Sequence, residues 1–187
     1  MDKGCGYASN QSTSRFTITP TESDIFTSIG DWLKTVLPAG TYILQGQQNQ
    51  TPQPIGLNCT MLMITRRRLA TNDWSYDRTA QTRTISEPTE LAVQVNIFGT
   101  GSGDAVHRVH SLWRDMYTTE YMANVGDYLA PLYATDPRQL GFVTAENQYS
   151  DGWSVDLHMQ VNFLVTTPQQ FANTVTVPVV VADIIKT

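Results

Sequence analysis

The sequence predicts an α+β domain with a mainly antiparallel β-sheet, flanked by two main helices and carrying an arm at each end. Two observations support this prediction. Residues 90–98 and 153–165 alternate apolar and polar side chains, and residues 25–36 and 105–116 repeat apolar ones at helical spacing. The elements follow one another as helix, strands, helix and strands, which is typical of an α+β fold. The chain has 187 residues, enough for one such domain.

The N-terminal residues 1–20 are rich in Ser, Thr, Asn and Gln and hold few large apolar side chains. Such a segment buries too little apolar surface to offset its ordering entropy, so we expect a flexible or partner-ordered arm. The domain is expected over residues 21–167, and it begins with a helix. Thr21 or Ser23 caps this helix, and the Pro and Gly of residues 38–40 end it. Its apolar face repeats Ile25, Ile29, Leu33 and Val36.

Strands are expected at four places between the two helices: residues 41–45, 57–65, 76–87 and 90–98. The second strand is mostly apolar and runs into three consecutive arginines, Arg66, Arg67 and Arg68. We expect the third to be exposed and to end at Pro88, which lacks the N–H that a central strand donates. The fourth is expected to be half-buried. Its apolar face is formed by Leu91, Val93, Val95 and Ile97.

A Gly-rich stretch, residues 99–103, is expected to break the sheet before the second helix. We expect Ser102 to cap that helix, because its hydroxyl can accept a hydrogen bond from a free backbone N–H. The predicted apolar stripe of the helix is Ala105, Val109, Leu112 and Met116. A shorter helical stretch, residues 119–124, is expected to follow and to close at Gly126.

Residues 131–142 are interpreted as an ordered loop, because Pro131 and Pro137 fix the backbone there. Asp136 and Arg138 stand on either side of Pro137. We expect both charges to be available to a partner, so the loop is predicted to face another subunit or another protein of the assembly.

The C-terminal third of the chain combines a long strand with an arm. Residues 153–165 give the strongest strand signal in the sequence. Residues 168–187 are predicted to be a C-terminal arm or an edge strand, because Pro168 and Pro178 exclude them from the middle of a sheet. An uncovered apolar strand is an aggregation hazard, and we expect the next subunit to cover this one. Its apolar row is Val175, Val177, Val179 and Val181.

Charge and composition exclude several classes of protein. The formal net charge of −5 argues against a protein that grips nucleic acid over a broad surface. Thr occurs 25 times and Lys three times, which suits strands and neutral polar contacts between subunits. No apolar run approaches a membrane span, and the N-terminus lacks the apolar core of a secretory signal. Cys5 and Cys59 have no metal-binding spacing and are expected to be free thiols.

Two motifs that resemble ligand sites are interpreted as structural. The stretch GTGSGD, residues 99–104, links a strand to a helix, but Asp104 replaces the third glycine of a dinucleotide loop and would repel a pyrophosphate. His107 and His110 share a helix face with Arg114, whose charge opposes a metal dication, so no metal role is expected. The sequence contains none of the common nucleophile or metalloprotease motifs. We therefore predict no catalytic residue, no metal and no cofactor.

Five of the 12 basic residues lie within the 18 positions from Arg66 to Arg83. One interpretation is a contact with a nucleic-acid backbone or with an acidic neighbouring subunit. The other is a solvated strand end whose arginines pair with Asp73 and Asp77. If the cluster is functional, the acidity of the whole chain favours salt bridges between subunits. Trp153, which begins the long strand, is expected to be a core or interface anchor.

Several short motifs occur in a fixed order: R-R-R-L-A-T (66–71), V-Q-V-N-I-F-G (93–99), P-L-Y-A-T-D-P-R-Q-L-G-F (131–142) and E-N-Q-Y-S-D-G-W (146–153). In their order and spacing, over residues 21–170, they resemble the phage neck and tail-terminator proteins of tailed bacteriophages and prophages. The resemblance implies a non-enzymatic virion protein that forms a ring, commonly a hexamer. Such a ring caps the tail tube and joins it to the neck, or connector, below the DNA-filled head.

The partners implied by this resemblance are other copies of the chain, the tail tube protein and the neck or connector proteins. Viral DNA passes through, no membrane is involved, and the protein lies in the virion tail or neck after assembly in the host bacterial cytoplasm. Two alternatives stay open: a head–neck adaptor that contacts DNA through the Arg66–Arg83 cluster, and a small enzyme. The interface candidates are Arg66, Arg67, Arg68, Asp136, Arg138, Trp153, Val175, Val177 and Val179.

Overall fold

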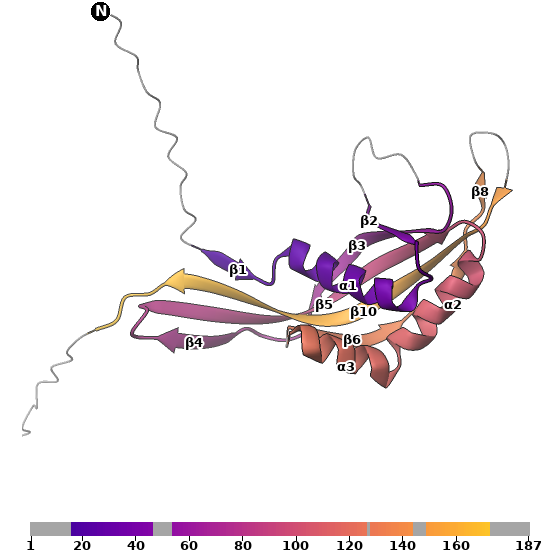
Figure 1. Ribbon diagram of the computed structural model, residues 1–187. Helices are drawn as coiled ribbons and strands as arrows, with labels where there is room; N and C mark the ends of the chain where they lie inside the picture. The colour runs from indigo at the N-terminus through magenta and orange to yellow at the C-terminus, as the bar shows by residue number, and fades with distance from the viewer. Residues whose placement is uncertain (1–15, 47–53, 127, 144–148, 173–187) are drawn as a thin grey trace, which may run out of the picture.

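The computed structural model describes residues 16–46, 54–126, 128–143 and 149–172. Within them, helices pack on one face of a curled, mostly antiparallel sheet (Figure 1), which confirms the predicted α+β fold. The helices are α1 (Glu22–Val36), α2 (Ser102–Trp113) and α3 (Met116–Val125). The sheet contains β1 (Thr17–Thr19), β2 (Tyr42–Gln45), β3 (Asn58–Arg68), β4 (Asp73–Asp77), β5 (Thr82–Phe98), β6 (Leu129–Ala134), β7 (Arg138–Gln139) and β10 (Gly152–Pro168). A separate small ladder pairs β8 (Phe142–Val143) with β9 (Tyr149–Ser150).

β5 and β10 run antiparallel and pair along their full 17 residues, so they form the spine of the sheet. Their neighbours differ at the two ends. Over residues 89–98 and 152–161 the pair lies between β3 on one side and β6 and β7 on the other; we call this half, together with the helices, the body. Over residues 82–88 and 162–168 the neighbours are β4 and β1. This second half, which we call the distal ribbon, projects beyond the helices (Figure 1).

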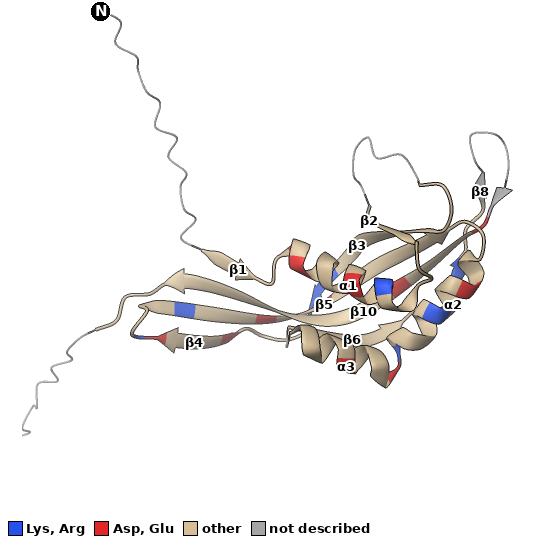
Figure 2. Cartoon of the chain, viewed as in Figure 1, with Lys and Arg blue, Asp and Glu red and all other residues tan. Residues whose placement is uncertain are grey.

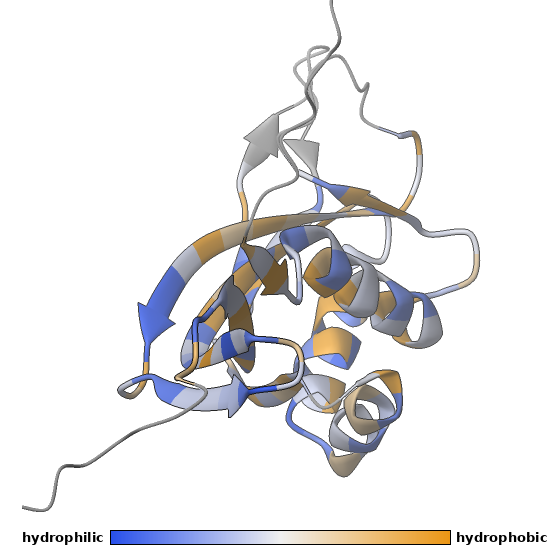
Figure 3. Cartoon of the chain, turned by 90° about the vertical axis from the view of Figure 1, so that its left-hand side faces the viewer, coloured by the Kyte–Doolittle hydropathy of each residue, from blue (hydrophilic) through white to orange (hydrophobic). Residues whose placement is uncertain are grey.

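The core lies between the three helices and the body half of the sheet, and Figure 3 shows apolar positions gathered there. Thr21 caps α1 as predicted: its hydroxyl accepts from the N–H of Asp24, whose carboxylate accepts in turn from the Thr21 N–H. Trp32 of α1 and Trp113 of α2 meet edge to face, with ring centroids 5.0 Å apart. The predicted apolar faces are confirmed as buried: Ile25, Ile29, Leu33, Val36, Leu91, Val93, Val95, Ile97, Val155, Leu157, Met159 and Val161.

Pro88 does not end a strand, contrary to the prediction. It lies inside β5, where the outer neighbour of β5 changes from β4 to β3. The Pro88 carbonyl accepts from the Leu69 N–H, so its nitrogen faces the same edge, at the gap between the two neighbours. A missing donor there costs little. The predicted single strand over residues 76–87 is also wrong: β4 and β5 form a hairpin whose turn is held by Asp77, which accepts from two backbone N–H groups.

The second helix differs from the prediction at both ends. Gly101, in the left-handed region with φ 83°, is its N-cap, and Ser102 is the first helical residue with a buried hydroxyl. Met116 is 71% exposed because it belongs to α3, which starts after a turn capped by the Asp115 side chain. Trp113 takes its place in the core and donates its Nε1–H to the His158 carbonyl at 3.1 Å. The buried residues of α2 are Ser102, Ala105, Val106, Val109 and Trp113.

The predicted loop over residues 131–142 is largely strand. β6 and β7 pair with β10, and Thr135 between them donates its N–H to the Asp156 carbonyl. Pro131 is tolerated because the register shifts beside it, between His158 and Met159 of β10. The sequence did not reveal this strand pairing, because two prolines six residues apart, Pro131 and Pro137, are also typical of a loop.

The predicted arms are described only at their inner ends. Residues 1–15 of the N-terminal arm lie outside the described residues, whereas Thr17–Thr19 pair with β10 as β1. Residues 173–187 of the C-terminal arm also lie outside them. Cys59 is a free, buried thiol, and its burial raises the pKa to about 12. Of the helices described, none has the length and apolarity needed to cross a membrane.

Candidate interaction surfaces

The distal ribbon has two chemically different faces, because side chains alternate along each strand. The cross-strand register places Ile18 of β1, Val165 of β10, Ile85 of β5 and Trp74 of β4 in one transverse line. We call these four residues the apolar row. The row continues the helix-facing side of β10, on which Phe163 is still buried, but Ile18 is 52% and Trp74 57% exposed. The ribbon therefore carries an apolar surface past the point where the helices stop.

The neighbouring transverse line on the opposite face is entirely hydroxylic. It runs through Thr17, Thr166, Thr84 and Ser75, which we call the hydroxyl row. The Oγ1 atoms of Thr84 and Thr166 are hydrogen-bonded across β5 and β10 at 3.1 Å. The alternation of the strands thus makes the ribbon amphipathic, with a neutral polar face and an apolar face.

The structure divides the predicted arginine cluster: Arg78 lies in the β4–β5 turn and Arg83 in β5, whereas the triplet ends β3. Each arginine of the triplet is paired within the chain. Arg66 binds Glu22 of α1, Arg67 binds Glu90 with N···O 2.6 Å, and Arg68 lies 3.8 Å from Glu87. The partners are glutamates of α1 and β5, so the predicted pairing with Asp73 and Asp77 is wrong. Those two carboxylates accept from backbone N–H groups of their own hairpin instead. The sheet register places Arg67 opposite Glu90, and the packing of α1 brings Glu22 to Arg66. The sequence alone reveals neither.

Glu90 is the centre of a polar network on the sheet face away from the helices. Its side chain is only 9% exposed and accepts from Arg67, from the Tyr133 hydroxyl at 3.1 Å and from His158 Nδ1 at 2.9 Å. The bond from His158, followed by those from Tyr133 and Arg67, holds the pKa of the Glu90 carboxyl below its ordinary value. The Tyr133 ring stacks on His158 at 4.2 Å, and burial raises the pKa of Tyr133. Sequence reasoning did not find this network, because its members come from separate strands.

The predicted pair Asp136 and Arg138 separates into one bound and one exposed charge. Arg138 binds Asp156 with N···O 2.9 Å, so it is not free as expected, although its side chain is 60% exposed. Asp156 also accepts from Gln94 at 3.2 Å. The Asp136 side chain is fully exposed and approaches His110 at 4.0 Å. Asp136 thus remains available to a partner, and Arg138 presents one edge of an existing ion pair.

The other interface candidates are anchored or outside the described residues. Trp153 is partly buried and packs against the core from the start of β10. A Cβ on Gly103 of α2 would lie 3.3 Å from the Trp153 Nε1, which explains a glycine in the first turn of that helix. The sequence predicted Trp153 to be either a core or an interface anchor. In the structure its buried part packs against the core. Val175, Val177 and Val179 lie outside the described residues.

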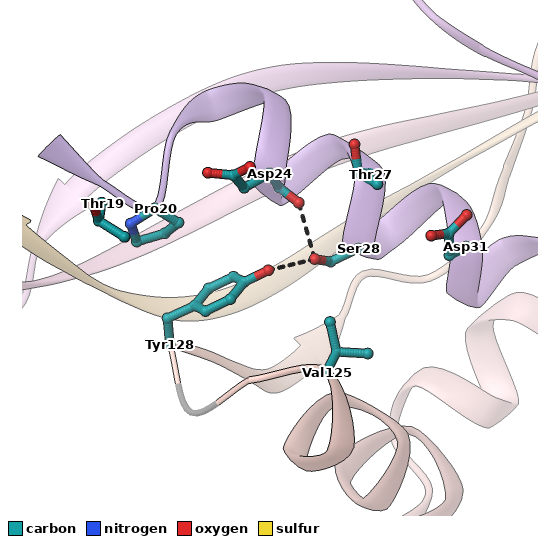
Figure 4. Close-up of a pocket in the computed structure, with 8 residues that line it drawn as sticks. All are labelled: Thr19, Pro20, Asp24, Thr27, Ser28, Asp31, Val125 and Tyr128. Carbon is teal, nitrogen blue, oxygen red and sulfur yellow. Dashed lines mark hydrogen bonds between the residues drawn. The ribbon is translucent and has the colours of Figure 1, made fainter.

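A hollow of about 360 Å³ lies between α1 and the junction of α3 with β6 (Figure 4). At its edge the hydroxyls of Ser28 and Tyr128 are 2.6 Å apart, and the Ser28 hydroxyl donates to the Asp24 carbonyl. The Asp24 carboxyl is engaged by Thr21, whose backbone and hydroxyl hydrogen bonds lower its pKa. A carboxylate that is held as a helix cap is poorly placed for chemistry on a ligand.

Metal-binding side chains do not gather in the part of the chain that the structure describes, where no three His, Cys, Asp or Glu residues come close enough to hold an ion. His107 is exposed on α2, and His110 faces Asp136. Figure 2 shows basic and acidic positions interspersed over the helices and the sheet. The surface with the clearest chemical contrast is therefore the distal ribbon.

Comparison with known proteins identifies the family. The model of the phage neck terminator protein family matches residues 23–185. The chain belongs to this family. Membership confirms the resemblance found in the sequence motifs and makes this chain a tail-terminating structural protein.

The fold of the chain is similar to that of a solved sheath/tube terminator. The PVC sheath/tube terminator of an extracellular contractile injection system, determined by cryo-EM in the extended state, matches with a TM-score of 0.50 at 10% identity. The match covers 87% of this chain and 63% of that one, so this chain spans less than two thirds of its structural neighbour. No curated protein matches the chain.

Proposed function

We propose that this protein forms a closed ring, a hexamer, that ends the tail tube and joins it to the neck or connector. The ring surrounds the path of the viral DNA, is built in the host cytoplasm and has a structural role without catalysis. Membership of the neck terminator family supports this proposal. The observation that carries it is the distal ribbon, an amphipathic extension with one apolar face that the described residues leave partly exposed.

The shape of the subunit favours contacts of the head-to-tail kind. The ribbon and the helical body lie at opposite ends of the β5–β10 pair (Figure 1) and have different surfaces. When two different surfaces of one chain meet, the contact is heterologous, and a heterologous contact that closes generates a cyclic ring. Interfaces between such subunits need neutral polar and apolar surfaces, which the two rows of the ribbon supply.

Negative-stain electron microscopy of the purified protein, with light scattering of the same sample, tests the ring. The expected result is annular particles with a central hole and a mass about six times the 20.9 kDa of the chain. A protein that stays monomeric at every concentration and does not associate with purified tails contradicts the proposal.

The alternative of a DNA-contacting head–neck adaptor is less well supported. Arg66, Arg67 and Arg68 are each paired with a glutamate, which neutralises much of the positive charge that phosphates require. DNA binding by the isolated protein that weakens steeply as salt is raised would favour the adaptor instead.

A further inference from the structure

The distal ribbon exposes apolar side chains on the face that the body buries. Val155, Leu157, Met159 and Val161 of β10 are fully buried under the helices, whereas Ile18 and Trp74 of the apolar row are more than half exposed. Covering apolar surface is favourable by roughly 25 cal/mol per Å². An exposed apolar patch on an otherwise polar ribbon marks a docking surface.

A segment of matching character exists at the C-terminus of the same chain. Residues 173–187 contain eight apolar residues and only one acidic and one basic residue, Asp183 and Lys186. In an extended segment the alternate valines 175, 177, 179 and 181 share one side. We propose that residues 173–187 of one copy bind the apolar row of a neighbouring copy. This inference rests on the proposed self-association and specifies the surface that sustains it.

The point where the described chain ends favours a neighbouring copy over the same one. The Gln169 N–H donates to the Gln81 carbonyl at 2.8 Å, at the tip of the β4–β5 hairpin, and Phe171 then packs edge to face on Tyr76. Even with this contact, Tyr76 and Trp74 of β4 stay 59% and 57% exposed, so the described chain leaves this side of β4 open. Fifteen further residues reach about 50 Å when extended, whereas a row across four strands measures only about 15 Å. The segment is longer than its own row requires and long enough to reach another subunit.

A hollow of about 360 Å³ at the root of the ribbon continues the apolar row. It is lined by Ile18, Phe163 and Val165 and by the charged groups of Arg66, Arg68 and Glu87. The apolar walls suit the side chains of Ile184 and Ile185 at the end of the segment. The exposed parts of the Arg66 and Arg68 side chains suit the carboxylate of Asp183, the residue that precedes the two isoleucines. The order of residues in the segment therefore matches the order of row and hollow along the ribbon.

Disulfide cross-linking between two differently tagged full-length chains tests the proposal. One chain carries Trp74→Cys and the other Val179→Cys, both with Cys5→Ser; Cys59 stays, because its burial keeps it from competing. We expect a cross-linked pair of unlike chains after mild oxidation of the mixture. Ser75→Cys is the matched control, since its side chain lies one residue away in the hydroxyl row, and it should cross-link at least about tenfold less.

Because Trp74→Cys removes part of the row, Ile18→Cys at the other end provides a second donor position. Failure of both row variants to cross-link with Val179→Cys overturns the proposal. So does a chain carrying both Trp74→Cys and Val179→Cys that forms the disulfide only within itself. Electron microscopy of the same samples separates the two proposals: rings without the inter-chain disulfide overturn this inference and leave the ring intact, whereas the disulfide without rings supports the inference and contradicts the ring.

Discussion

The two halves of the β5–β10 pair have the same alternating pattern but different environments. In the body, helices α1, α2 and α3 cover the apolar side, and Leu91 and Leu157 have no exposed surface. In the distal ribbon, the same side continues through Ile85 and Val165, and none of the helices in the described part of the chain lies over it. Alternation thus determines which face of a strand is apolar, whereas the neighbouring elements determine whether that face is buried within the subunit or left for a partner.

The opposite faces of the two halves differ as well. In the body this face carries charged groups whose bonds are completed within the subunit, around Glu90 and Asp156. In the ribbon it carries hydroxyls, as in the Thr84–Thr166 pair. Charges enclosed in one subunit stabilise its fold, and neutral hydroxyls suit a surface that meets other subunits. From this difference we propose that the body serves mainly folding and the ribbon mainly association.

The strongest test of this division compares two apolar residues of β5 on the same face, Leu91 and Ile85. Leu91→Ala removes a fully buried side chain and should lower the free energy of unfolding by about 2–5 kcal/mol. Ile85→Ala removes a half-buried one and should cost less than about 1.5 kcal/mol. Urea denaturation followed by circular dichroism measures both values.

The same pair separates folding from association. Light scattering should show that Ile85→Ala weakens self-association in samples that remain fully folded. Equal losses of stability for the two variants would mean that the ribbon is as integral to the subunit as the body.

The second test concerns the enclosed charge of the body. Glu90→Gln keeps the shape of the side chain but removes the acceptor charge shared by Arg67, Tyr133 and His158, and should cost about 1–3 kcal/mol. Because the folded-state pKa of Glu90 is lowered, its contribution is complete above the ordinary pKa of 4.5 and is lost as pH falls through the folded value. Thermal unfolding from pH 7 to pH 3 should therefore show a smaller acid loss in Glu90→Gln than in the wild type. Parallel pH profiles for the two proteins would contradict this account.

The sequence predicted the elements of the body better than their partners. The periodicity of α1 and the alternation of β10 were sufficient to predict these two elements, because each pattern is a property of one continuous segment. The Glu90 network was missed, since it depends on the register that brings His158 and Tyr133 together across separate strands. Pro88 was misjudged for the same reason: whether a missing N–H is costly depends on which strand lies beside it.

A third test asks whether Arg138 acts in folding or in association. Arg138→Ala leaves Asp156 partly buried without its cation and should cost about 1 kcal/mol, a moderate effect because the guanidinium is 60% exposed. Its effect on joining to tails is expected to be larger than this loss of stability. Asp136→Ala, at a fully exposed neighbouring charge, is the matched control that should leave stability unchanged. Normal tail joining by Arg138→Ala would remove this residue from the interface.

The smallest effect is expected on the outer side of the body, at the two histidines of α2. His107 is exposed, and His110 lies 4.0 Å from the exposed carboxylate of Asp136. An ion pair at that distance with an exposed partner contributes little, so His107→Ala should change the free energy of unfolding by less than about 0.5 kcal/mol and His110→Ala by about 1 kcal/mol at most. Neither change touches the ribbon, so the mass of the assembled particle should stay the same in light scattering. Elemental analysis of the purified wild type should find no stoichiometric zinc. A variant that carries both substitutions should behave in the same way. If it loses bound zinc or its melting temperature collapses, this side of the body has a role of its own.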